Sequence, residues 1–303
     1  KTIAGCMVAW LLMSLARGVL VEWGVLPEAT PKLSPWLSYV ALGTVADCVS
    51  LGGSPANRAV VSHGLTLINR MDAACWRAMA ARLGADSVPF NAETLAFQMG
   101  PRINARSRLD DPYAALHFML AESDGVANRQ LEVLDQDNQS RKAIEADMAE
   151  EARALAVPAL EANEPAVVVL LEDGHPGVQG IVASRLVQAY GRPAVVLTRA
   201  AAPNMLTGSG RSIDGLHLRD ALQRTFELAP EALPRFGGHS GAAGVGVPRE
   251  QLDTFKAAFL QAVGEQLGDT PLYPRLWTDG ELSTAQLSLA TLVEIETLGP
   301  AAI

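Results

Sequence analysis

Apolar residues in the first third of the chain cluster into segments separated by short polar breaks. Residues 3–20 would be apolar on most faces of a helix, which predicts a helix covered on both sides. Residues 36–49 form a second apolar segment, and its length leaves helix and strand both open. Residues 57–83 have a helical pattern with a predicted break near residues 69–72.

The pattern becomes polar in the next part of the chain. Residues 100–112 are dense in Arg, Asn and Asp, which predicts a loop. Residues 113–155 are helix-rich, with an expected interruption at residues 123–125. Residues 126–155 would form one helix about 45 Å long at 1.5 Å per residue. This segment is highly charged and has no sustained heptad repeat, so it is more typical of a connector between domains than of a coiled coil.

Strand-like segments begin after residue 165. A Val-rich strand at residues 166–171, a helix at 177–190 and a strand at 194–198 give a βαβ-like order. Such an order predicts a sheet with helices packed against it, and hence an α/β fold. Further elements are predicted at residues 205–207 and 242–247 (strands) and at residues 216–224 and 251–267 (helices).

Length and composition narrow the class of protein. A chain of 303 residues suits two domains with a piece of a third, and 49% hydrophobic residues indicate a globular protein. The 33 acidic residues outnumber the 24 Lys and Arg, which weakens the case for bulk duplex binding but permits a local basic groove. Aromatic residues make up only 5% of the chain, which argues against an aromatic platform as the main binding surface.

Cysteine spacing and the first residues indicate a cytoplasmic protein. The three cysteines lie far apart and form no CxxC pair, which is typical of reduced thiols rather than disulfides or a zinc site. The apolar run at residues 3–16 ends at Arg17 and is too short to span a bilayer. No clear small-residue cleavage site follows it, so a buried helix of a truncated chain is expected rather than a signal peptide.

Residues 207–212, Thr-Gly-Ser-Gly-Arg-Ser, are the first candidate for an anion site. Gly208 and Gly210 would let backbone N–H groups approach an anion, and Ser209 would add a hydroxyl. Arg211 offers a planar guanidinium fork that suits phosphate oxygens. The Lys and the spacing of a Walker A loop are absent. A tight turn with a surface arginine explains the same six residues equally well.

The second candidate is Gly237-Gly238-His239, followed by small residues up to Gly244. Paired glycines would bring the backbone of His239 close to a ligand, and its imidazole could bond a phosphate or a leaving oxygen. A glycine-rich entry into a strand with an incidental histidine is the alternative. Together with the first candidate in the same predicted domain, the motif favours an anion site.

The third candidate follows a predicted strand and opens a predicted helix. His175 and Gln179 lie at this junction, where helix N–H groups and the helix dipole favour an anion. Arg185 lies two turns further along the same helix. A structural loop with a capping histidine accounts for the spacing as well.

Arginines are concentrated in the predicted loop at residues 100–112. Arg102, Arg106 and Arg108 would repel one another unless anions or nearby aspartates compensate them. Together with Asn104 they suit contact with a nucleic-acid backbone. A solvated loop that carries its own aspartates is the other interpretation.

Asp47 is the only acidic residue in the apolar segment at residues 36–49. A carboxylate in such a segment is costly unless it is paired, hydrogen-bonded or metal-bound. One acid cannot make a hydrolytic site, because two-metal phosphodiester hydrolysis needs several ligands holding ions about 4 Å apart. By itself Asp47 is more often a capping or ion-paired residue.

These elements, in this order, resemble the RecJ exonucleases of the DHH phosphoesterase superfamily. Residues 41–47, Ala-Leu-Gly-Thr-Val-Ala-Asp, resemble the fourth motif of the family. The stretch Gly-Pro-Arg-Ile-Asn-Ala at residues 100–105 resembles the segment before its linker helix. Residues 208–212 and the motif at residues 237–244 are similar to the DHH-associated domain.

The resemblance implies a domain order and an activity. It divides the chain into the C-terminal part of a DHH catalytic domain (1–111), a helical connector (112–156), a DHH-associated phosphate-binding domain (157–268) and the beginning of an oligonucleotide-binding barrel (269–303). The implied activity is 5′-to-3′ hydrolysis of single-stranded DNA in repair and recombination, with Mn²⁺ or Mg²⁺ in a two-metal site. Implied partners are single-stranded DNA with a 5′ phosphate and a helicase or single-strand-binding protein, with no membrane.

The resemblance also assigns roles to single residues. Asp47 would bind a metal, Ser209 and Arg211 would recognise a terminal 5′ phosphate, and His239 would contact the scissile or a neighbouring phosphate. Arg102 and Arg108 would guide the strand. The other residues expected to bind substrate are Asn104, His175, Gln179, Arg185, Gly208, Gly210, Gly237 and Gly238.

The chain also departs from the family pattern. The Asp-rich first motif and the Asp-His-His motif are absent, and Arg106-Ser107 stands where relatives tend to have Ala-Gly. We therefore expect a chain truncated at both ends that binds metal poorly and cleaves little or nothing. Two alternatives are a DHH phosphoesterase acting on short oligonucleotides or small nucleotides, and a non-catalytic replication-partner scaffold of the same fold.

Overall fold

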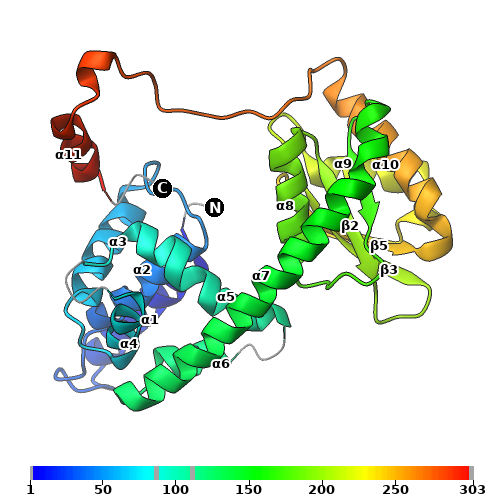
Figure 1. The fold of residues 1–303 in the computed structure, drawn as a ribbon. Coiled ribbons are helices and arrows are strands. Elements are labelled where there is room, and N and C mark those ends of the chain that lie inside the picture. Colours follow the sequence, from blue (N-terminus) through cyan, green and yellow to red (C-terminus); the bar gives the residue numbers. More distant parts are fainter. Residues whose placement is uncertain (1–2, 85–88, 110–112, 300–303) are drawn as a thin grey trace. The chain divides into compact units, whose positions relative to one another are not determined.

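The computed structural model describes residues 3–84, 89–109 and 113–299 (Figure 1). The chain divides into two compact units: unit 1 contains residues 1–139 and 280–303, and unit 2 contains residues 140–279. A five-stranded sheet with helices packed against it confirms the predicted α/β class.

In unit 1 the described residues form helices joined by short connections. The longer ones are α1 (Gly5–Glu22), α2 (Leu37–Ala46), α3 (Pro55–Ile68), α4 (Ala74–Leu83), α5 (Gly100–Leu109), α6 (Ala114–Met119), the first part of α7 (Asp124–Glu161) and α11 (Leu289–Thr297). Two short 3₁₀ turns, η1 (Ser34–Trp36) and η5 (Thr284–Gln286), and a π-helical turn, η2 (Thr94–Met99), complete the unit.

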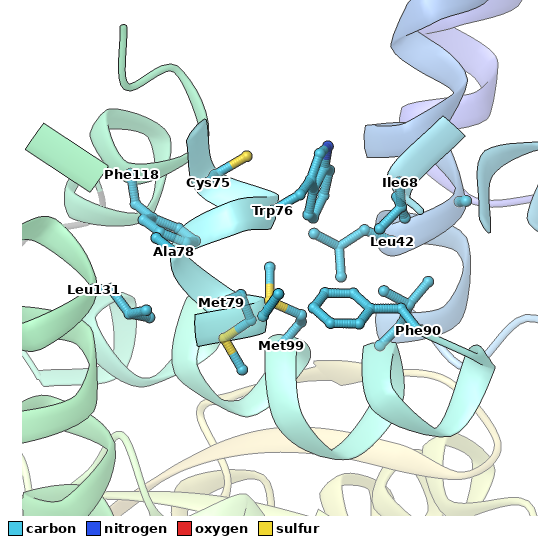
Figure 2. Packing of buried hydrophobic residues seen from close by; sticks show 14 of the residues in the cluster. Leu42, Ile68, Cys75, Trp76, Ala78, Met79, Phe90, Met99, Phe118 and Leu131 are labelled. Carbon is cyan, nitrogen blue, oxygen red and sulfur yellow. The ribbon is translucent and has the colours of Figure 1, made fainter. Parts of the chain in front are cut away.

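The core of unit 1 is built around Trp76 and Met79 of α4, which are 2% and 0% exposed. Figure 2 shows these side chains among residues from the neighbouring helices, including Leu42 and Phe118. Helices α2 and α3 touch closely at Gly64, where a Cβ would lie 2.6 Å from the carbonyl oxygen of Leu37. The apolar segment at residues 36–49 therefore forms helix α2, and α3 packs against the α2 backbone at Gly64.

The predicted break in the helical pattern of residues 57–83 is confirmed. Ser54 caps α3 by accepting a hydrogen bond from the Asn57 N–H at 3.3 Å, and Pro55 occupies the first helical position. Met71, in the connection between α3 and α4, has φ +56°. This left-handed conformation cannot continue a helix.

The prediction that the first helix is covered on both sides is wrong for the described residues. Only Met7 of α1 is buried, and Leu12 and Leu15 are 65% and 67% exposed. The prediction assumed neighbours on two faces, whereas the described residues that cluster with α1 come from α2, from α3 and from the loop before α2. The prediction that this apolar segment is too short to span a bilayer is also wrong, because among the described helices α1 is long and apolar enough to do so by length and composition. Core helices and signal sequences pass the same test.

Unit 2 contains the rest of α7 and one mixed sheet. Its strands are β1 (Val167–Leu170), β2 (Ala194–Arg199), β3 (Met205–Arg211), β4 (Arg235–Gly238) and β5 (Ala242–Pro248), in the order β1-β2-β3-β5-β4. The β1–β2 pair is parallel and the other pairs are antiparallel. The helices are α8 (Gln179–Tyr190), α9 (Leu218–Leu228) and α10 (Leu252–Leu267), with short turns η3 (Pro230–Ala232) and η4 (Arg249–Gln251).

The two faces of the sheet are covered differently. Figure 1 shows α8 on one side of the sheet and α9 and α10 on the other. Val195 and Leu197 pack into the cluster under α9 and α10, whereas Ala194 and Val196 pack toward α7 and α8. By the same alternation, Leu206 of β3 faces α9 and α10. The odd-numbered residues of β3, from 207 to 211, therefore point to the α8 side.

Candidate functional site

The structure corrects the predicted anion-binding loop at residues 207–212. Residues up to Arg211 lie in β3, which pairs with β2 on one side and β5 on the other, so their N–H groups belong to ladders. A Cβ on Gly210 would lie 3.1 Å from Cδ2 of Leu218, and one on Gly208 would lie 2.9 Å from Cγ2 of Val245. Both glycines thus leave room for neighbouring side chains of the core. Their contact with a phosphate stays a prediction.

Ser209 and Arg211 share the face of β3 on the α8 side. The guanidinium of Arg211 lies across Gly180, near the start of α8, because a Cβ there would be 3.1 Å from its Cζ. Its Nη1 donates a hydrogen bond to the Gly210 carbonyl at 2.8 Å. Gly180 was not among the predicted site residues. The sequence feature that could have identified it is a glycine in the first turn of the helix predicted at residues 177–190.

Glycines occupy much of this side of the sheet beyond β3. Ser209 pairs with Gly244, and Gly244 pairs with Gly237, so one row crosses three strands with no side chain after the serine. A groove of about 680 Å³ lies over this part of the sheet, and its lining includes Gly237, Gly244, Gly246 and Arg235. Adjacent strands are about 4.8 Å apart, so the row spans about 10 Å and leaves room for a phosphate group.

The turn between β4 and β5 carries His239, two residues after Gly237, which lines this groove. The His239 N–H donates to the Ala242 carbonyl at 2.8 Å, and its side chain is exposed. Gly238 has φ +150°, and a Cβ there would lie 2.5 Å from Cα of Ala243. Gly238 therefore has no room for a side chain in this turn, and the approach of His239 to a ligand stays a prediction.

The residues at the start of α8 have internal partners. Gln179 is 2% exposed, and its Nε2 donates to Thr198 Oγ1 at 2.7 Å and to the Thr207 carbonyl at 2.8 Å. It therefore joins α8 to β2 and β3. Nδ1 of His175 accepts a hydrogen bond from the Gly177 N–H at 3.1 Å, as in the capping alternative.

Arg185 is paired with a carboxylate of α7. Its Nη2 lies 3.0 Å from Oε1 of Glu145, whose Oε2 lies 2.6 Å from Nη1 of Arg141. The ion pair supplies a structural role for Arg185. Its contact with substrate stays a prediction, as do those of Gln179 and His175.

Asp47 is exposed at the C-terminal end of α2 in unit 1. Asp47 and Asn104 line one cavity of about 780 Å³ whose other walls are mainly apolar, including Trp10 and Ile103. Burial raises the pKa of the Cys6 thiol in this cavity. In the part of the chain that the structure describes, no three His, Cys, Asp or Glu residues gather closely enough to hold a metal ion.

The predicted loop at residues 100–112 is instead helix α5, with residues 110–112 outside the described residues. Its arginines are compensated by α7: Arg102 Nε lies 2.6 Å from Asp135 Oδ1, and Arg106 Nη1 lies 3.1 Å from Asp137 Oδ1. These long-range ion pairs relieve the repulsion that was expected between the arginines. The side chain of Arg108 lies outside the described residues.

Asp135 is the central carboxylate of this arrangement. Burial raises its pKa, but hydrogen bonds from Arg82 and Arg102 outweigh burial and hold the pKa below the ordinary value of 3.8. Its side chain is only 9% exposed. A carboxyl whose pKa is lowered by folding stabilises the folded state above its unfolded pKa and loses that contribution as pH falls.

Replacing Asp135 by asparagine is expected to lower the free energy of unfolding by about 2 kcal/mol, because two charge-assisted hydrogen bonds are lost. Arg82 is half exposed, so solvent screens its share. Urea unfolding at pH 7 and pH 3.5 measures the effect, and the difference between wild type and variant should shrink at the lower pH. Asp124→Asn, which breaks an exposed pair with Arg77, is the control and should cost under about 0.5 kcal/mol. Equal losses in the two variants would contradict the prediction.

Comparisons with known proteins identify the family. Residues 163–265 match the DHHA1 domain family. The single-stranded-DNA-specific exonuclease RecJ of Dickeya dadantii is 39% identical over 99% of this chain and 53% of its own length. That of Escherichia coli is 35% identical over 99% of this chain and 53% of its own length. The crystal structure of RecJ with Mn²⁺ from Thermus thermophilus superposes with a TM-score of 0.75 and 29% identity, covering 93% of this chain and 39% of that one.

The glycine-rich sheet and the family match define a protein with a DHHA1 domain. Within that class, the chain belongs to the RecJ family, as the sequence motifs predicted. The chain spans about half the length of the curated relatives it matches.

Proposed function

We propose that the protein hydrolyses single-stranded DNA from its 5′ end as a metal-dependent exonuclease, and that unit 2 holds the terminal phosphate. One observation carries the proposal: Ser209 and Arg211 lie on one face of β3, and Ser209 pairs with Gly244, one of the glycines that line the neighbouring groove. A guanidinium and a hydroxyl give charge-assisted hydrogen bonds to phosphate oxygens, and glycines permit close approach. The relatives' names, which describe single-stranded-DNA-specific exonucleases, support the same substrate.

Mn²⁺ or Mg²⁺ is the cofactor that the titles of the related RecJ structures support. Asp47 is exposed at a helix end and would supply one ligand. The described residues contain no group of three or more potential ligands, so by themselves they do not fit a two-metal centre. The proposed contribution of these residues is therefore binding and orientation of the strand.

The remaining roles are proposals of the same kind. We propose that His239 contacts a phosphate next to the terminal one, because its turn adjoins the groove. Asn104 shares a cavity with Asp47, which supports contact with the strand near the metal. The domain division at residues 111, 156 and 268, a cytoplasmic role in repair and recombination, and a helicase or single-strand-binding partner belong to the same proposal.

Binding of this chain to short oligothymidylates tests the proposal. We expect a 5′-phosphorylated strand to bind at least about tenfold more tightly than the unphosphorylated strand, since a phosphate held by Arg gains charge-assisted hydrogen bonds. A 3′-phosphorylated strand has the same charge and is the matched control. Fluorescence anisotropy across a salt series separates the end-specific contribution from general attraction. Equal affinity for the 5′- and 3′-phosphorylated strands would exclude an end-recognition site in this chain.

A further inference from the structure

A second cavity of unit 2, of about 520 Å³, lies beneath residues 270–277, here called the strap. The strap crosses the C-terminal end of α8 at Gly191, which has φ +63°. A Cβ on Gly191 would lie 2.5 Å from the backbone nitrogen of Pro274, so the strap rests directly on the helix end. Leu272 also packs against the core of unit 2. The wall of this cavity is therefore held at two points.

The cavity adjoins the residues proposed to bind phosphate. Ser212 lines it and directly follows Arg211, and its N–H donates to the Gly241 carbonyl at 3.0 Å. Ser240 lines it and directly follows His239. At the end of β3, Arg211 is a phosphate-binding candidate and Ser212 lines the cavity. After the end of β4, His239 is a phosphate-binding candidate and Ser240 lines the cavity.

The lining favours a flat, neutral group with polar edges. Trp277 lines the cavity and is 73% exposed, so its indole is available for stacking on a flat group. Tyr273 already has the guanidinium of Arg275 over its ring, 5.2 Å from the centroid. Asp214 also lines the cavity, and its carboxylate disfavours a phosphate but accepts hydrogen bonds from amino or ring N–H groups. A nucleobase has this combination of a stacking face and hydrogen-bonding edges.

We propose that this cavity binds a nucleobase of the single strand whose 5′ phosphate is held at Ser209 and Arg211. The inference rests on the proposed function and deepens it, because the end of the strand would be recognised through a base as well as through its phosphate. Stacking is tolerant of sequence, since every base has a π face. The cavity would therefore hold the strand end in position without selecting one base.

Strands with a single abasic position test the inference. The probes are 5′-phosphorylated oligothymidylates that lack the base at nucleotide one, two, three or four, measured with the 303-residue chain. Loss of the bound base should weaken binding about tenfold at one position only, and Trp277→Ala should weaken the intact strand by a similar factor. In Trp277→Ala the abasic strand should bind no worse than the intact one, because the same contact is removed twice.

Trp23→Ala is the matched control, since Trp23 is 71% exposed and ends α1 in unit 1, outside this cavity. It should leave every affinity unchanged. If all abasic strands bind like the intact strand while the 5′-phosphate preference persists, the base site is overturned and the proposed function stands. If the phosphate preference is absent as well, both fail. A loss in Trp277→Ala that is equal for intact and abasic strands would assign Trp277 a structural role and also overturn the base site.

Discussion

Arg211→Ala is expected to remove most of the preference for a 5′-phosphorylated end, with an affinity loss of about 50-fold for the phosphorylated strand. The side chain provides a planar fork on the α8 side of the sheet, and Gly180 gives it room. Loss of charge-assisted hydrogen bonds of this kind costs about 1.5–3 kcal/mol. Affinity for the unphosphorylated strand should fall by less than about threefold. Arg211→Lys should be intermediate, because an ammonium keeps the charge but not the fork.

Arg224→Ala is the control for this experiment, because it removes the same charge from α9, on the opposite face of the sheet. It should change the two affinities equally and slightly. Thermal melting of both variants checks that unit 2 still folds. If Arg211→Ala lowers the affinity equally for phosphorylated and unphosphorylated strands, Arg211 attracts DNA only through its charge and does not recognise the 5′ phosphate.

The sequence motif at residues 207–212 identified a plausible site but gave the wrong local structure. Gly-x-Gly has a period of two, which suits a strand as well as a loop. In β3 the glycines face Leu218 and Val245, while Ser209 and Arg211 face the α8 side. Sequence alone could not separate the two cases, because the side chains that leave no room for a Cβ belong to other elements, Leu218 of α9 and Val245 of β5.

The prediction of a loop at residues 100–112 was wrong for a related reason. Arg102 and Arg106 look like a repulsive cluster when only their local sequence is considered. Their partners, Asp135 and Asp137, lie about thirty residues later on α7 and make α5 a compensated helix. In contrast, the long helix and the βαβ order were predicted correctly, since both depend on local periodicity and on turn residues.

Gly238→Ala is expected to destabilise unit 2 by about 3 kcal/mol and to disturb the turn that carries His239. Gly238 has φ +150°, and an added Cβ would lie 2.5 Å from Cα and 2.7 Å from Cβ of Ala243. Strain at such a φ costs about 1–3 kcal/mol, and overpacking against backbone adds a similar amount. Urea unfolding monitored by circular dichroism measures the loss. Affinity for the 5′-phosphorylated strand should fall as well, since β4 and β5 frame the groove.

Gly237→Ala, one residue earlier, separates folding from binding. No atom lies within 4 Å of a Cβ built at Gly237, and its φ is not positive, so stability should change by less than about 0.5 kcal/mol. The new methyl group would nevertheless stand over the bare row formed by Ser209 and Gly244. Affinity for the phosphorylated strand should therefore fall about tenfold although the fold is intact, provided that a phosphate lies close to this floor. Unchanged affinity in Gly237→Ala would move the ligand away from the glycines and leave Gly238 with a structural role alone.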